Sequence, residues 1–121
     1  MRPTVLIVDD HAGFRGFARA MLDAEGFDVI GEADNGQAAV QAVHQLGPDL
    51  VLLDIALPDM DGFEVCKAVS AVDGTGPLVV LTSSRDASTF GPKLGTSAAR
   101  GFIPKADLTG ATLTAVIDGS G

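Results

Sequence analysis

Basic residues are scarce in this sequence, and their scarcity argues against a surface that binds nucleic acid. The 121 residues include 8 lysines and arginines against 16 aspartates and glutamates, so the formal net charge is −8 at pH 7. Affinity for nucleic acids comes largely from lysine and arginine side chains that neutralise phosphates. We therefore expect no direct contact with nucleic acid.

Long hydrophobic runs are missing as well. The runs at residues 4–8 and 50–53 are far shorter than the roughly 18 residues that a transmembrane helix needs. Asp9 and Asp10 follow the first apolar run too early for that run to be a secretory signal. We expect no membrane insertion and a cytoplasmic location.

Cysteine is nearly absent, because Cys66 is the sole example. No disulfide can form within the chain, and we interpret Cys66 as a small buried thiol that packs in the core. Hydrophobic residues make up 46% of the sequence and charged residues 20%, which suffices for a folded core. We expect one domain over residues 1–121.

Short apolar runs alternate with segments of helical periodicity. Five runs of branched or aliphatic residues are predicted to be strands, at residues 5–8, 29–30, 50–53, 78–81 and 101–103. Helical stripes comprise Phe14, Phe17, Ala18, Met21 and Leu22; Ala39, Ala42, Val43 and Leu46; Val65, Cys66, Val69 and Val72; and Leu113, Val116 and Ile117. This alternation predicts a doubly wound α/β domain with a parallel sheet.

Glycine and proline mark the expected helix ends. Gly26 and Gly47 can end the first two helices, because glycine adopts left-handed backbone angles without strain. Gly91, Pro92 and Gly95 predict that a helix between residues 86 and 100 is short or irregular.

Side chains suited to phosphate or metal chemistry follow successive predicted strands. They are Asp9, Asp10, Asp54, Thr82 and Lys105. The carboxyl ends of parallel strands meet at one edge of the sheet, where such folds bind ligands. For the strand order 2-1-3-4-5, the three aspartates are expected to share one pocket.

Three carboxylates in one pocket repel one another. Two unit charges about 4 Å apart repel by on the order of 4 kcal/mol at an effective dielectric near 20, so the cluster needs a cation or a raised pKa. Magnesium prefers such oxygen ligands. Asp54 can then act as a nucleophile toward phosphorus, while Thr82 and Lys105 stabilise charge on the phosphoryl oxygens.

Each of these residues has a simpler interpretation when taken singly. Asp10 could cap the following helix, Thr82 could be a turn residue, and Lys105 could be a solvated side chain. Phe102 alone would be a core residue. Their coincidence at one sheet edge favours a functional site.

Four motifs together make the sequence resemble a response-regulator receiver domain of bacterial two-component signalling, over essentially the whole chain. They are VLIVDD at residues 5–10, LLDIALPDMDG at 52–62, LTSS at 81–84 and GFIPK at 101–105. The resemblance implies a flavodoxin-like fold and phosphorylation of Asp54 by a histidine kinase or a phosphotransfer protein. It also implies a regulatory module with slow self-dephosphorylation rather than an enzyme.

The resemblance further assigns roles to site residues. It implies Mg²⁺ held directly by Asp10, Asp54 and the backbone carbonyl of Ala56, with Asp9 acting through water. Lys105 is implied to pair with the carboxylate or the phosphoryl group. The family's switch pair corresponds to Thr82 and Phe102, in which the hydroxyl moves toward the phosphoryl oxygen and the ring turns inward.

Two further features concern the subgroup of receiver domains that this sequence resembles and the peptide bond between Lys105 and Ala106. His11 and the segment at residues 29–36 resemble receivers that usually carry a C-terminal helix-turn-helix domain. Because the sequence stops soon after its last predicted helix, we expect a single-domain regulator, with an isolated receiver segment of a transcriptional regulator as the alternative. Many receivers have a cis bond to proline after the lysine, but Ala106 follows Lys105, so a cis bond is left open.

Two other functions fit this fold class. A Mg²⁺-dependent phosphatase with an aspartate nucleophile requires a general acid two residues after that nucleophile, and this sequence has Ala56 there. A flavin binder would want uncharged donors in the first loop, where this sequence has Asp9 and Asp10. Both alternatives therefore lack a feature that they need.

Overall fold

A computed structural model describes residues 2–70 and 76–119 of the chain. The strands are β1 (Thr4–Val8), β2 (Asp28–Ala33), β3 (Leu50–Asp54), β4 (Leu78–Ser83) and β5 (Gly101–Pro104). The α-helices are α1 (Ala12–Ala24), α2 (Gly36–Leu46), α3 (Gly62–Val69), α4 (Lys93–Thr96) and α5 (Gly110–Asp118), and short 3-10 turns lie at Ala87–Thr89 and Lys105–Asp107. Among the described residues, no helix has the length and hydropathy that crossing a membrane requires.

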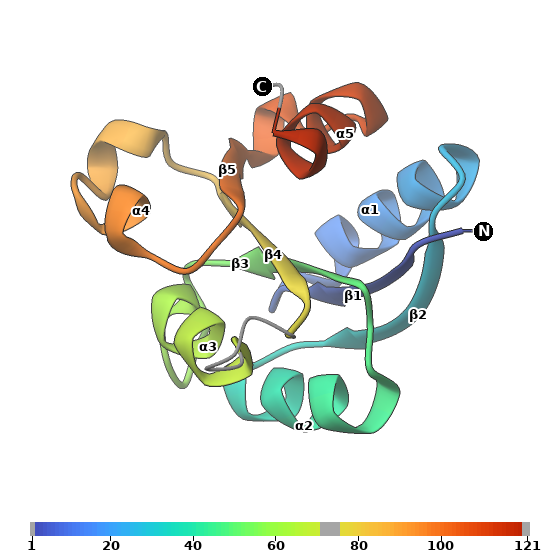
Figure 1. Cartoon of the computed structure of the whole chain (residues 1–121), viewed down its shortest axis with the longest axis horizontal. Coiled ribbons are helices and arrows are strands. Elements are labelled where there is room, and N and C mark those ends of the chain that lie inside the picture. Colours follow the sequence, from blue (N-terminus) through green and yellow to red (C-terminus); the bar gives the residue numbers. More distant parts are fainter. Residues whose placement is uncertain (1, 71–75, 120–121) are drawn as a thin grey trace.

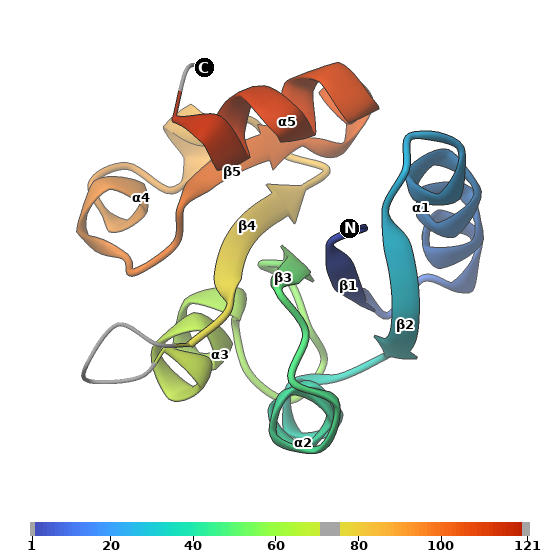
Figure 2. The same cartoon turned by 45° about the vertical axis from the view of Figure 1, so that its right-hand side comes forward.

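The five strands form one parallel sheet in the order β2-β1-β3-β4-β5, as predicted (Figure 2). The winding direction reverses between β1 and β3. The register places Asp54 beside Thr82 on neighbouring strands. Val8 of β1 pairs with Leu53 of β3, so the ends of these two strands meet at the edge where the sequence predicted a shared site.

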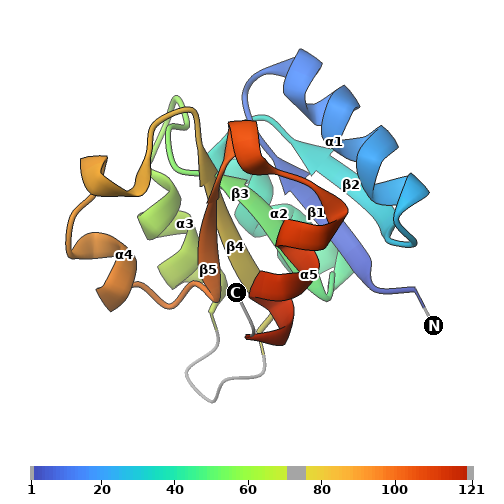
Figure 3. The ribbon, with the colours of Figure 1, turned by 90° about the horizontal axis from the view of Figure 1, so that it is seen from above.

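The sheet separates two hydrophobic clusters (Figures 1 and 3). One face packs against α2 and α3, and this cluster contains Cys66, which is fully buried as predicted. The other face packs against α1 and α5. Both faces of β1 and β3 are covered, which explains why these strands are continuous apolar runs.

Glycine geometry at the helix ends matches the predictions. Gly26 and Gly47 have φ angles of +94° and +57°, in the left-handed region that residues with a Cβ atom rarely adopt. Gly91 has a φ of +56° and separates the 3-10 turn Ala87–Thr89 from α4. The predicted short, irregular helix between residues 86 and 100 is confirmed.

Two of the described residues of the predicted stripes are exposed. Phe17 is 53% exposed and Leu46 is 46% exposed. Helical spacing gives the direction of the apolar face but not the width that the sheet covers, and both residues lie at the margin of that face. Val72, another stripe residue, lies outside the described residues.

Candidate functional site

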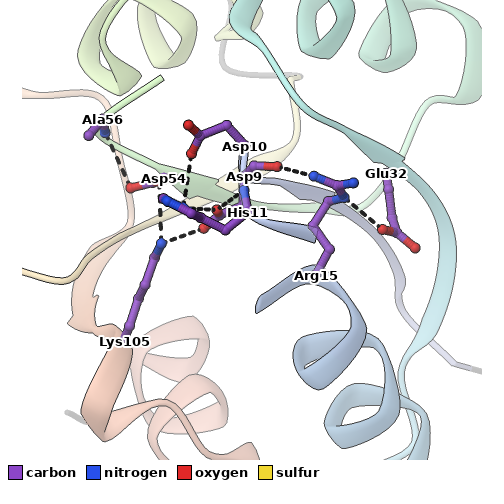
Figure 4. Close-up of polar contacts among 8 residues, drawn as sticks. All are labelled: Asp9, Asp10, His11, Arg15, Glu32, Asp54, Ala56 and Lys105. Carbon is purple, nitrogen blue, oxygen red and sulfur yellow. Dashed lines mark hydrogen bonds and ion pairs between the residues drawn. The ribbon is translucent and has the colours of Figure 1, made fainter. Parts of the chain in front are cut away.

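Acidic residues and a lysine from three strand ends meet at the carboxyl edge of the sheet (Figure 4). Lys105 Nζ lies 2.7 Å from Asp9 Oδ2 and 3.4 Å from Asp54 Oδ2. Asp9 has no exposed surface and Asp54 has 2%. Two buried carboxylates so close together need a positive charge nearby, and the Lys105 ammonium supplies one.

Burial and neighbouring charges perturb the pKa values of Asp54 and Lys105. Loss of solvation raises the pKa of Asp54, the negative charge of Asp9 raises it further, and Lys105 partly offsets both. Burial by itself would lower the pKa of Lys105, but its contacts with Asp9 and Asp54 leave that pKa raised. Lys105 is therefore held as a cation against both carboxylates.

Four residues at this edge of the sheet are arranged so that they could hold a metal ion. Asp9, Asp10, His11 and Asp54 each offer a ligand atom, and these atoms lie within 4.8 Å of one another. The side chain of Asp10 is about one-third exposed, which leaves the cluster open to solvent on that side. Carboxylate oxygens suit a hard divalent cation, so the donor set fits magnesium.

His11 is a member of this cluster that sequence analysis did not identify as a site residue. Its Nδ1 lies 3.2 Å from Asp9 Oδ1 and 3.1 Å from Asp10 Oδ1, and its backbone N–H donates to Asp9 Oδ1 at 2.8 Å. His11 is also the N-cap residue of α1. Asp10 therefore does not occupy the capping position, and the only sequence signal for His11 was its place after the acidic pair.

Arg15 fixes the loop that carries the acidic pair. Its Nη1 donates to the backbone carbonyl of Asp9 at 2.7 Å, and its Nε donates to Glu32 at 2.9 Å. Glu32 also accepts from Arg19 at 2.8 Å, and the hydrogen bonds from Arg19 and then Arg15 lower the pKa of Glu32. No pattern in the sequence predicted this contact between α1, β2 and the loop.

The loop after Asp54 is closely packed. The backbone N–H of Ala56 donates to Asp54 Oδ1 at 3.2 Å, so Ala56 lies beside the carboxylate. Its carbonyl remains a predicted metal ligand. A Cβ at Gly62 would lie 2.7 Å from the backbone oxygen of Asp54, so only glycine fits there without a shift.

The same loop is attached to α2. Asp59 Oδ1 accepts from the N–H of Gly36 at 2.7 Å, and Asp59 Oδ2 accepts from the N–H of Gln37 at 2.9 Å. These two bonds from backbone N–H groups lower the pKa of Asp59. They satisfy donors that the first turn of a helix leaves without an intrahelical partner.

Thr82 lies next to Asp54 with an unused hydroxyl. It is 1% exposed, and among the described residues its Oγ1 has no hydrogen-bond partner. A buried hydroxyl without a partner is costly, which is consistent with a group that gains a partner in another state. Phe102, the other residue of the predicted switch pair, is half-buried and packs against Phe90, with ring centroids 5.8 Å apart.

No cis peptide bond occurs in the described parts of the chain. The bond between Lys105 and Ala106 is therefore trans. Lys105 nevertheless reaches both carboxylates, and its Nζ also lies 4.6 Å from the centre of the Phe14 ring.

Comparison with known proteins identifies relatives of the whole domain. Residues 5–117 match the response regulator receiver domain family. The chain is 40% identical over 101 residues to a transcriptional regulator of Pseudomonas aeruginosa, covering 84% of this chain and 48% of that protein. It is 46% identical over 88 residues to the DNA-binding response regulator MtrA of Mycobacterium tuberculosis, covering 71% of this chain and 37% of that protein.

Solved structures agree with these matches. The signal receiver domain of the response regulator NarL from Mycobacterium tuberculosis superposes with a TM-score of 0.81 at 35% identity, covering 98% of this chain and 96% of that one. The chain spans about half the length, or less, of the curated relatives named above. The similarity therefore concerns the domain that they share with this chain.

Proposed function

Because the chain belongs to the response regulator receiver domain family, we propose that residues 1–121 act as a phosphoacceptor signalling domain modified at Asp54. The observation that carries the proposal is that Asp54, Asp9 and Lys105 converge at one edge of the sheet, with the Lys105 ammonium within ion-pair distance of both carboxylates. A carboxylate nucleophile and a fixed cation beside the partly exposed Asp10 suit phosphoryl transfer.

The proposed donor is a phosphohistidine of a histidine kinase or of a phosphotransfer protein. An Asp54 carboxylate oxygen attacks phosphorus, a P–O bond forms, the P–N bond breaks, and the imidazole leaves with the electron pair. Lys105 then lies where it can pair with a phosphoryl oxygen, because its ammonium is already 3.4 Å from Asp54 Oδ2. Such a donor places the proposed site in the cytoplasm.

Magnesium is the proposed cofactor. Asp10, Asp54 and the carbonyl of Ala56 would hold it, with Asp9 acting through water, and bound Mg²⁺ would neutralise charge on the phosphoryl oxygens. His11 lies against Asp9 and Asp10, so its ring nitrogen is a candidate for a further ligand.

The proposed response to phosphorylation starts at Thr82. Its buried Oγ1 can donate to a phosphoryl oxygen on the neighbouring strand end and so gain the partner that it lacks. Phe102 would then turn inward and change the shape of a surface that other proteins bind. We propose a regulatory role with slow self-dephosphorylation, protein partners and no direct contact with nucleic acid.

The test is incubation with acetyl phosphate and Mg²⁺ followed by mass spectrometry. We expect one phosphoryl group on Asp54 in the wild type and none on Asp54→Ala. The exposed Asp28→Asn is a matched control and should be modified like the wild type. Equal modification of the wild type and Asp54→Ala would reject the proposal.

A further inference from the structure

An apolar groove lies between α3 and α4, away from the acidic pocket. Its volume is about 670 Å³, within the range of natural ligand sites. The residues that line it are Phe63, Lys67, Ser70, Lys93, Thr96, Ser97 and Ala98. Figures 1 and 3 both show α3 and α4 side by side at this place.

The charge around the groove differs from that of the whole chain. Acidic residues outnumber basic ones by two to one in the sequence, but no acidic residue lines the groove within residues 2–70 and 76–119. The charged side chains among these lining residues are the exposed Lys67 and Lys93. Lys93 Nζ also lies 5.8 Å from the centre of the Phe63 ring, so a cation and an apolar surface are adjacent.

A row of aromatic rings joins the groove to the predicted switch residue. Phe63 in the groove packs edge-on against Phe90, with centroids 6.1 Å apart, and Phe90 packs against Phe102 at 5.8 Å. Rings in edge-to-face contact restrict one another's orientation. A rotation of Phe102 would therefore displace Phe90 and change the wall of the groove formed by Phe63.

We propose that this groove binds an acidic peptide segment of a partner protein. An aliphatic or aromatic side chain of the peptide would enter the groove beside Phe63, and its carboxylates would pair with Lys67 and Lys93. Charge complementarity selects this occupant, because a basic segment would face two lysines. The coupling to Asp54 rests on the proposed function, whereas the groove and its charge do not.

The experiment uses the full chain and a fluorescein-labelled twelve-residue peptide with leucine anchors at i and i+4 and four glutamates. Fluorescence anisotropy gives the affinity, and amide chemical shifts of ¹⁵N-labelled protein locate the contact. We expect shifts at α3 and α4, roughly fivefold weaker binding by Lys67→Ala/Lys93→Ala, and weaker binding at higher salt. The double variant Arg2→Ala/Arg19→Ala removes the same charge on the α1 side of the sheet and should bind like the wild type.

Two further peptides test the chemical class. Replacing the glutamates with lysines, or the leucines with serines, should each abolish binding. Equal binding of either peptide, or shifts on another face, would overturn the proposal. Self-association of the protein through this groove, seen in sedimentation, would do the same by identifying a second copy as the occupant.

Phosphorylation with acetyl phosphate and Mg²⁺ tests the coupling. We expect the affinity to change roughly fivefold in the wild type, and the conservative variant Phe90→Leu to bind the peptide without that change. Mass spectrometry of the same samples separates the two ideas. A phosphorylated Asp54 with no peptide binding overturns the groove alone, whereas peptide binding without modification of Asp54 supports the groove and rejects the proposed function.

Discussion

Lys105 lies closer to Asp9 than to Asp54, at 2.7 Å against 3.4 Å. The ammonium thus spans two buried carboxylates and compensates a repulsion that would otherwise oppose folding. This relationship makes the site a determinant of stability as well as of chemistry.

Replacement of Lys105 with methionine should therefore destabilise the protein. The change leaves Asp9 buried without a cation, which typically costs about 3–5 kcal/mol when the partner cannot relax. Lys67→Met, at an exposed lysine, should change the free energy of unfolding by less than about 0.5 kcal/mol. Urea unfolding without Mg²⁺ measures both, and addition of Asp9→Asn to Lys105→Met should restore part of the loss. Equal free energies of unfolding for Lys105→Met and Lys67→Met would contradict the role assigned to Lys105.

Arg15 and Arg19 provide a matched pair for testing how the acidic loop is held. Both donate to Glu32, but only Arg15 donates to the carbonyl of Asp9. Arg15→Ala should lower stability by about 1–2 kcal/mol and weaken Mg²⁺ binding severalfold in calorimetric titration. Arg19→Ala should cost about 0.5 kcal/mol and leave Mg²⁺ affinity unchanged. An unchanged affinity in Arg15→Ala would show that the loop keeps its shape without this contact.

Glu32 gives a prediction about pH. Its hydrogen bond from Arg19, followed by that from Arg15, lowers its pKa below 4.5 in the folded protein. The ionised side chain therefore stabilises the fold at pH values above 4.5, and this contribution is lost as the pH falls through the lowered pKa. Glu32→Gln should be about 0.5–1 kcal/mol less stable than the wild type at pH 7. Thermal unfolding from pH 7 to 3 should show the difference shrinking toward zero, and a constant difference would contradict the assignment.

Gly62 and Gly16 should respond oppositely to alanine. A Cβ at Gly62 would meet the backbone of Asp54 and Ile55 at 2.7 Å, whereas nothing lies within 4 Å of a Cβ at Gly16. Gly62→Ala should cost about 1–3 kcal/mol and slow phosphorylation of Asp54, because the loop must shift. Gly16→Ala should stabilise α1 by roughly 0.5–1 kcal/mol. Circular dichroism melting curves compare the two, and stabilisation by both would refute the packing argument.

The sequence predicted the parts of the site that depend on topology. Asp9 and Asp54 lie at the ends of the neighbouring strands β1 and β3, and Lys105 follows β5 at the same edge of the sheet. Their approach therefore required no knowledge of side-chain angles. The contacts of His11 and Arg15 could not be predicted, because they depend on how α1 packs against the sheet. Helical periodicity predicted which face of α1 is apolar, but not how much of that face the sheet covers. For this reason Phe17 was placed in the apolar stripe although its side chain is exposed.

The separation of the two hydrophobic clusters by the sheet has a consequence for assembly. The groove belongs to the layer of α3 and α4, while Lys105 and its ring contact with Phe14 belong to the layer of α1 and α5. A protein bound over α1 and α5 would leave the groove free. Two partners could therefore occupy one molecule at once, and this small domain could serve as a bridge between them.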